Sequence, residues 1–294
     1  VKIQTYEPQD ITVNSNHPNF TIKGGLWNNK TFWSIYKKAC TPFNWHDDAF
    51  NLASKRKINL FSTPFSIRAA NLLKSFNVSL YKIASLEITD LRLVKHIASF
   101  NKPIIISTGA SKLQEVKKAI QTIRKYHNKI IILHCVSGYP TKIEDANVKR
   151  ITYLKNNFKN NMIGLSDHTD NIYSSLASVP LGIVAIEKHL KISEKSKTLD
   201  SEFSITPKQL SYLKEYSVNI FKSYGKLKKE NTIDKSIRVM RRSLYAKTNI
   251  QKGEKIKLSQ INILRPLIGI PAEKYLSVIN KKAKIDIKKD APIN

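Results

Sequence analysis

Short apolar runs alternate with amphipathic stretches from residue 1 to residue 224. The runs are bounded by polar residues, which favours buried strands, and apolar residues recur at helical spacing between them. The strand candidates are residues 1–5, 59–62, 80–84, 103–107, 129–133, 162–165 and 183–186. The helix candidates are residues 31–39, 47–55, 67–76, 91–99, 112–126, 145–157, 172–178 and 207–224. A repeat of this size predicts successive strand–helix units in a parallel sheet.

Polar side chains that can bind ligands or transfer protons follow most of these strands. They are Thr63, Ser85, Glu87, Ser107, Ser137, Tyr139, Ser166, His168 and His189. A parallel barrel builds its active site from the carboxyl ends of many strands, whereas a doubly wound sheet usually carries a Gly-rich phosphate turn, which is missing from this sequence. We therefore predict a (β/α) TIM barrel. The seven strand candidates are one fewer than the eight of a closed barrel.

The pattern changes after the last helix candidate. We predict a barrel domain over residues 1–224, a basic polar linker over 225–240 and a small, mostly β domain over 241–294. The alternating runs of that small domain are residues 243–246, 261–264 and 282–287, separated by Gly and Pro.

The formal net charge of +28 raises the question of a nucleic-acid partner. Lys, Asn and Ile are abundant together and the lysines are spread over all segments, which indicates compositional bias instead of a dedicated surface. We therefore expect no specific nucleic acid, and keep polyanion binding as an alternative. No apolar run approaches the roughly 18 residues of a membrane span. The two cysteines, Cys40 and Cys135, make no disulfide framework, and we expect a cytoplasmic protein.

Two histidines form the candidate metal site. His168 and His189 each follow an apolar run and lie one strand–helix–strand unit apart, so their imidazoles can enter one pocket beside Ser166. That arrangement suits a divalent metal with open positions. The alternative is that each histidine is an ordinary core or capping residue.

A second set of residues predicts anion binding. Lys2 and Lys82 supply positive charge, and five strand-end hydroxyls supply donors that a phosphate or carboxylate needs in place of water. The hydroxyls belong to Thr63, Ser85, Ser107, Ser137 and Ser166. The alternative for each one is a helix N-cap.

A family resemblance joins these sets. The motifs that carry it are Val1–Gln4, Phe61–Phe65, Tyr81–Glu87, Ile106–Gly109, His134–Pro140, Gly164–Thr169 and Ile186–His189. In this order they resemble the sialic acid (nonulosonic acid) synthase family. Arg241–Tyr245 and Arg265–Pro266 resemble that family's C-terminal antifreeze-like domain (SAF, a β-clip fold).

The resemblance implies condensation of phosphoenolpyruvate with an open-chain amino-sugar aldehyde, which gives a nine-carbon keto acid and phosphate. His168 and His189 would hold the metal, manganese or else magnesium, and Lys82 and Glu87 are the catalytic candidates, Glu87 in proton transfer. Phosphoenolpyruvate would be bound by Lys2, Thr63, Lys82, Ser85, Ser107, Ser137 and Ser166. The sugar would be lined by Gln4, Tyr139, Asp200 and Arg265. The resemblance places Arg265 on the partner subunit of a domain-swapped homodimer.

Within that family, Gly24–Trp27, the Tyr36 region, Thr41–His46 and Asp200–Ser204 resemble the pseudaminic acid synthase branch more than N-acetylneuraminate or legionaminate synthases. Local packing is the alternative for the aromatic turn Thr41–His46. The family's first strand, with its glutamate and Asn-His pair, has no counterpart here, so the resemblance implies that the barrel lacks its first strand–helix unit. A partial chain that binds sugar without turnover therefore stays open as a third class of function.

Overall fold

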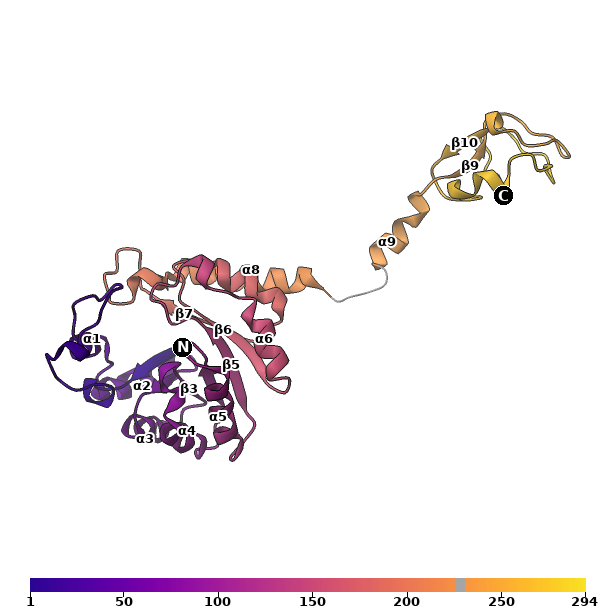
Figure 1. Cartoon of the computed structure of the whole chain (residues 1–294). Helices are drawn as coiled ribbons and strands as arrows, with labels where there is room; N and C mark the ends of the chain where they lie inside the picture. Colours follow the sequence, from indigo (N-terminus) through magenta and orange to yellow (C-terminus); the bar gives the residue numbers. More distant parts are fainter. Residues whose placement is uncertain (226–230) are drawn as a thin grey trace. The chain divides into compact units, whose positions relative to one another are not determined.

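The structure is a computed structural model that describes residues 1–225 and 231–294. Eight strands form one sheet in chain order, and all neighbouring strands are parallel (Figure 1). They are β1 (Lys2–Thr5), β2 (Phe61–Pro64), β3 (Tyr81–Ile83), β4 (Ile104–Ser107), β5 (Ile130–Cys135), β6 (Met162–Asp167), β7 (Ile186–Leu190) and β8 (Ser204–Ile205).

Helices connect the strands as the amphipathic stretches predict. The α-helices are α1 (Phe32–Ala39), α2 (His46–Lys55), α3 (Ile67–Ser75), α4 (Leu91–Ala98), α5 (Leu113–Arg124), α6 (Arg150–Asn157), α7 (Tyr173–Ser178), α8 (Pro207–Tyr224) and α9 (Thr232–Ile237). The 3-10 turns are η1 (Pro8–Asp10), η2 (Pro18–Phe20), η3 (Phe43–Trp45), η4 (Leu86–Thr89), η5 (Ile143–Asp145), η6 (Val179–Leu181), η7 (Ser201–Phe203), η8 (Arg238–Met240), η9 (Leu258–Gln260) and η10 (Ala272–Ser277). Side chains cap several helix starts: Ser66 accepts from the Ala69 N–H, and Asp90 accepts from those of Arg92 and Leu93.

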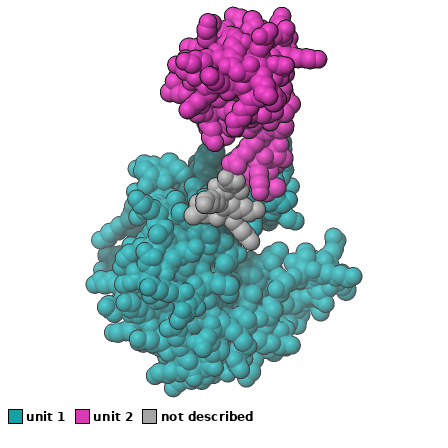
Figure 2. Space-filling model, turned by 90° about the vertical axis from the view of Figure 1, so that its right-hand side faces the viewer, with its two compact units in different colours: residues 1–225 teal, residues 226–294 magenta. Residues whose placement is uncertain are grey.

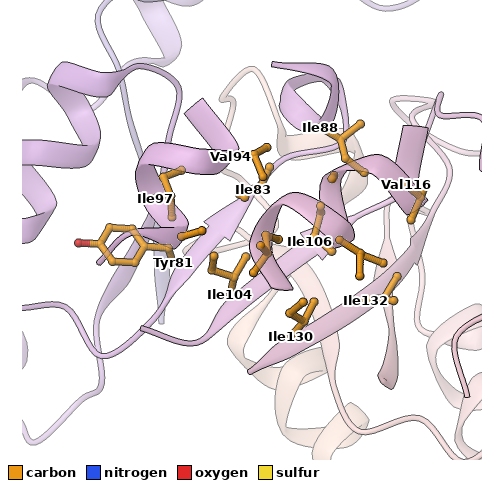
Figure 3. Packing of buried hydrophobic residues seen from close by; sticks show 14 of the residues in the cluster. Tyr81, Ile83, Ile88, Val94, Ile97, Ile104, Ile106, Val116, Ile130 and Ile132 are labelled. Carbon is orange, nitrogen blue, oxygen red and sulfur yellow. The ribbon is translucent and has the colours of Figure 1, made fainter. Parts of the chain in front are cut away.

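The main core lies between the sheet and its helices. Alternate strand residues point there, because successive side chains of a strand face opposite sides. Figure 3 shows Ile104 and Ile106 of β4 packed with Ile97 of α4 and Val116 of α5. The other alternate residues, such as Lys82 and Ser107, therefore point to the inner face of the curled sheet, where the site candidates lie.

Two details of the sheet differ from the prediction. We expected seven strands, but the structure has an eighth, β8, whose two residues carry no alternating pattern of their own. The last predicted strand, residues 183–186, is displaced to Ile186–Leu190, because Ser166 and Asp167 of β6 pair with Glu187 and Lys188. His189 therefore lies within a strand. β1 and β8 are the ends of the sheet order, and the missing first unit stays a prediction.

Clustering of contacts divides the chain into two units, residues 1–225 and 226–294, coloured teal and magenta in Figure 2. In the second unit, β9 (Ser243–Ala246) and β10 (Ile261–Leu264) pair antiparallel around a small apolar core. The third run expected there, residues 282–287, forms only single bridges through Lys282 and Ile287. The predicted linker is partly helical, as α9 and η8 show, and its residues 226–230 lie outside the described residues.

Candidate active site

The inner face of the sheet gathers most of the predicted site residues. Alternation along each strand places them on the side opposite the helix-packed core. They are Lys2 and Gln4 of β1, Thr63 of β2, Lys82 of β3, Ser107 of β4, Ser166 of β6 and His189 of β7. The pairing register sets Gln4 beside Thr63.

Glu187 links the two lysines, a role that its sequence position alone does not predict. Its Oε2 lies 3.4 Å from Lys2 Nζ, and its Oε1 lies 3.7 Å from Lys82 Nζ. Ser166 Oγ donates a 2.8 Å hydrogen bond to Oε1. The available signal was its position two residues before His189, which places both side chains on one face of β7.

Burial and neighbouring charges shift the pKa values of Glu187 and Lys82 in opposite directions. Burial raises the pKa of Glu187, but Lys82 and Lys2 lower it more strongly, so its carboxyl group stays ionised. Burial lowers the pKa of Lys82, and Glu187 opposes that shift. The carboxylate therefore keeps two ammonium groups together in a largely buried place.

Several hydroxyls near these charges have free hydrogen-bonding capacity. Among the described residues, the buried Oγ1 of Thr63 and the Oγ atoms of Ser107 and Ser137 lack a hydrogen-bond partner. Buried polar atoms normally have partners, so three orphaned hydroxyls near two lysines fit an anionic ligand. Ser85 precedes η4, but its side chain does not cap that turn and instead accepts from the Gly109 N–H at 2.9 Å. The capping interpretation is wrong for Ser85.

Gly109 lies against this hydroxyl cluster. A Cβ at this position would lie 2.3 Å from Ser137 Oγ, 3.0 Å from Ser85 Oγ and 3.1 Å from Cys135 Sγ. Only a residue without a side chain leaves those three groups their space. The close approach explains the Ile106–Gly109 motif in physical terms.

The two histidines lie side by side, with ring centroids 5.3 Å apart. His168 Nδ1 is 2.9 Å from the Val136 carbonyl oxygen, and His189 Nδ1 is 3.2 Å from Asp200 Oδ2. Since both partners are acceptors, we assign the proton of each neutral ring to Nδ1, which leaves the Nε2 lone pairs free. An acceptor behind each histidine is the usual arrangement around a bound metal.

The pKa values of the two imidazoles are shifted in opposite directions. Burial lowers the pKa of His189 and outweighs the opposing effect of Asp200. Burial also lowers the pKa of His168, but hydrogen bonding to Cys135 and to the Val136 carbonyl reverses the net direction to a raised pKa. Within residues 1–225 and 231–294, no group of three or more His, Cys, Asp or Glu side chains is arranged to hold a metal ion. The histidines fit as two ligands of an incomplete coordination shell.

Aromatic rings enclose the histidines. Tyr139 lies 4.5 Å from the His168 ring centroid, and Phe203 lies 4.9 Å from that of His189. Trp27 reaches this wall from the long segment before α1, 6.0 Å from the Tyr139 ring. Leu190, Lys191, Lys197 and Asp200 line a hollow of about 1030 Å³ next to His189. It offers space for a polar substrate.

Glu87 lies on η4, after β3. Burial raises its pKa to about 7, against the lowering effects of a backbone hydrogen bond and Lys82. Its Oε2 is buried and has no partner among the described residues. A carboxyl group that titrates near neutral pH can both give and accept a proton.

Two further predictions concern Arg265 and the aromatic turn. Arg265 belongs to the second unit, directly after β10, and is exposed. In the aromatic turn, His46 is fully buried, with Nε2 2.8 Å from Thr5 Oγ1 and Nδ1 3.1 Å from the Pro42 carbonyl oxygen. These contacts support the packing interpretation of the turn.

The comparisons with known proteins identify the family. Residues 1–229 match the NeuB family, and residues 241–294 match the SAF domain. The chain belongs to the NeuB family. It is 38% identical to a pseudaminic acid synthase of Helicobacter pylori, over 100% of this chain and 87% of that protein. It is 33% identical to an N,N'-diacetyllegionaminic acid synthase of Campylobacter jejuni, over 99% of this chain and 88% of that protein.

A solved structure of a related enzyme has a fold similar to that of this chain. The N-acetylneuraminic acid synthetase of Leptospira borgpetersenii, crystallised with citrate, is 28% identical, with a TM-score of 0.70, over 80% of this chain and 77% of that chain. The predicted family and the SAF domain are therefore confirmed. As a NeuB-family member the chain is an enzyme, a transferase of the sugar-acid synthase type. No described helix has the length and apolar character needed to cross a bilayer.

Proposed function

We propose that this chain is a nonulosonic acid synthase that condenses phosphoenolpyruvate with an open-chain acetamido sugar, preferably the pseudaminic acid precursor. One water molecule is consumed, and the products are a nine-carbon keto acid and inorganic phosphate. One observation carries the proposal: two histidines with free Nε2 atoms share the inner face of the sheet with two lysines held together by Glu187. The 38% identity to pseudaminic acid synthases supports this choice of sugar.

The chain binds the phosphate and carboxylate of phosphoenolpyruvate through its buried donors. Lys2 and Lys82 supply charge, and Thr63, Ser107 and Ser137 supply hydroxyls that have no partner among the described residues. Ser85 and Ser166 complete this group of hydroxyls. Because Glu187 already holds both ammonium groups, the anion meets donors that need little reorganisation.

His168 and His189 hold the divalent metal, with manganese as the first choice and magnesium as the second. When bound, the metal supplies Lewis-acid polarisation of the sugar aldehyde. Glu87 exchanges a proton with a sugar hydroxyl at its carboxyl oxygens, as its pKa of about 7 allows. Gln4, Tyr139 and Asp200 line the sugar side.

Assembly and location complete the proposal. The chain forms a domain-swapped homodimer in which Arg265 of the SAF unit reaches the sugar's acetamido group. Support comes from the SAF match and from the exposure of Arg265 in its own unit. A solution mass of one chain would contradict the dimer. The reaction takes place in the cytoplasm, in agreement with the two free cysteines, Cys40 and Cys135.

Phosphate release from phosphoenolpyruvate tests the activity. The full chain with manganese is offered the pseudaminic acid precursor and N-acetylmannosamine in parallel. We expect release with the first sugar and a loss of at least about 100-fold in His168→Ala, because a bound metal supplies several kcal/mol. His96→Ala on α4, whose ring bonds to Asn71 outside the site, is the matched control. Release with neither sugar would refute the proposal. Release with N-acetylmannosamine alone would assign the chain to the N-acetylneuraminate synthase branch instead of the pseudaminic acid synthase branch.

A further inference from the structure

A buried ion pair lies on the outer side of the sheet, directly behind the two histidines. Asp167 of β6 and Lys188 of β7 are partners in the strand register. Lys188 Nζ lies 3.2 Å from Asp167 Oδ2, and the exposed fractions of the two side chains are only 3% and 1%. Each member directly precedes a histidine: Asp167 precedes His168, and Lys188 precedes His189.

The pair has a full set of hydrogen bonds. Asp167 Oδ1 accepts from the backbone N–H and the hydroxyl of Thr169, both at 2.8 Å, and Oδ2 accepts from Ser175 Oγ at 2.6 Å. Lys188 Nζ also donates to the Thr169 carbonyl oxygen. Thr169 follows His168, and Ser175 lies in α7. The network therefore connects the backbone on either side of His168 to β7 and to the helix behind it.

Stability does not account for charges at this place. Ile163 and Leu165, the other residues of β6 on the same face, pack into the apolar core. Well-packed apolar residues in place of a buried ion pair are often neutral or stabilising, because removing two charges from water is unfavourable. A directional, fully bonded pair does something that apolar contacts do not, since it fixes the register and the spacing of two strands.

We infer that Asp167 and Lys188 are positioning residues that hold the imidazoles of His168 and His189 at the separation a divalent cation requires. The inference rests on the proposed function, in which these two histidines bind the metal. It adds a second layer of support, since Val136 and Asp200 fix the rings through Nδ1 while the ion pair fixes the strands that carry them.

Manganese(II) binding to the full chain, followed by electron paramagnetic resonance of the free ion, tests this without turnover. In the double variant Asp167→Leu/Lys188→Met neither charge is left unpaired. We expect this variant to fold, with a manganese dissociation constant raised about 10- to 100-fold, the usual effect of losing support behind metal ligands. The matched control is Lys155→Met, which removes a lysine that bonds to the carbonyls of Leu181 and Gly182, before β7 begins. We expect wild-type affinity there.

A folded double variant with wild-type manganese affinity would overturn the inference and leave the proposed function intact. If the double variant does not fold, the nearly isosteric Asp167→Asn decides: a rise in the dissociation constant supports the inference, and an unchanged value overturns it. If wild-type protein binds no manganese, the metal site of the proposed function fails, and the positioning role fails with it.

Discussion

Glu87 should make the stability of the protein depend on pH in an unusual direction. Its pKa is raised from 4.5 to about 7 by burial. A raised carboxyl pKa means that the folded state holds its proton more tightly than the unfolded state. The corresponding stability is present below pH 4.5 and is lost as pH rises through about 7. Most paired carboxylates act in the opposite direction.

The size of the effect follows from the shift. A difference of about 2.5 pKa units corresponds to about 3 kcal/mol, at 1.36 kcal/mol for each unit. Since part of the Glu87 side chain reaches solvent, we take about 1 to 3 kcal/mol as the range. Glu87→Gln cannot ionise and avoids this penalty. We therefore expect it to be more stable than wild type by that amount at pH 8, and by less than about 1 kcal/mol at pH 5.

Urea denaturation of metal-free protein at pH 5, 6, 7 and 8 measures this difference, with the transition of the first unit followed by the fluorescence of Trp27, Trp33 and Trp45, which all lie in that unit. Glu87→Asp keeps an ionisable carboxyl group, so it should retain the wild-type direction of pH dependence. A gap between Glu87→Gln and wild type that does not widen from pH 5 to pH 8 would refute our account of Glu87. So would a less stable Glu87→Gln at pH 8.

Two further substitutions test the anion site. Gly109→Ala should fold but raise the KM for phosphoenolpyruvate about tenfold or more, because its Cβ would lie 2.3 Å from Ser137 Oγ; an unchanged KM would contradict the proposed role of Ser137. Glu187→Gln should lower the free energy of unfolding by up to about 3 kcal/mol, because Lys82 loses its buried partner. Inorganic phosphate should raise the melting temperature of wild type and recover part of the loss in Glu187→Gln, and no stabilisation of either protein would argue against an anion site at these lysines.

Local pattern was sufficient to predict most of the inner face. Lys82 lies between Tyr81 and Ile83, and Ser107 follows Ile106; because these neighbours pack on the helices, the period of two assigns Lys82 and Ser107 to the opposite side of the sheet. His168 and Ser166 follow by the same rule from Leu165. These predictions needed only the chain direction and the fact that parallel strands end at one edge of the sheet.

Other features depend on contacts between distant segments. β8 has two residues, and it is a strand because Ser204 and Ile205 pair with His189 and Leu190 of β7. Trp27 joins the aromatic wall because the chain before α1 folds back toward Tyr139. In the sequence, His46 cannot be told from a histidine of the site. In the structure, it is buried in the interior and both of its ring nitrogens contact Thr5 or Pro42. Sequence spacing does not determine which residues meet in these cases.

Two motifs depend both on local sequence pattern and on contacts between distant segments. They are Ser166–Asp167–His168 and Glu187–Lys188–His189. Their first and third members face the inner side, where Ser166 donates to Glu187 and the two histidine rings meet. Their middle members face the outer side, where Asp167 and Lys188 form the buried ion pair. The polar contacts on both faces of the sheet therefore limit which residues these two strand segments can carry. A one-residue slip would bury the histidines among isoleucines and expose the ion pair to the site, so the polar residues fix the register more strictly than apolar residues do.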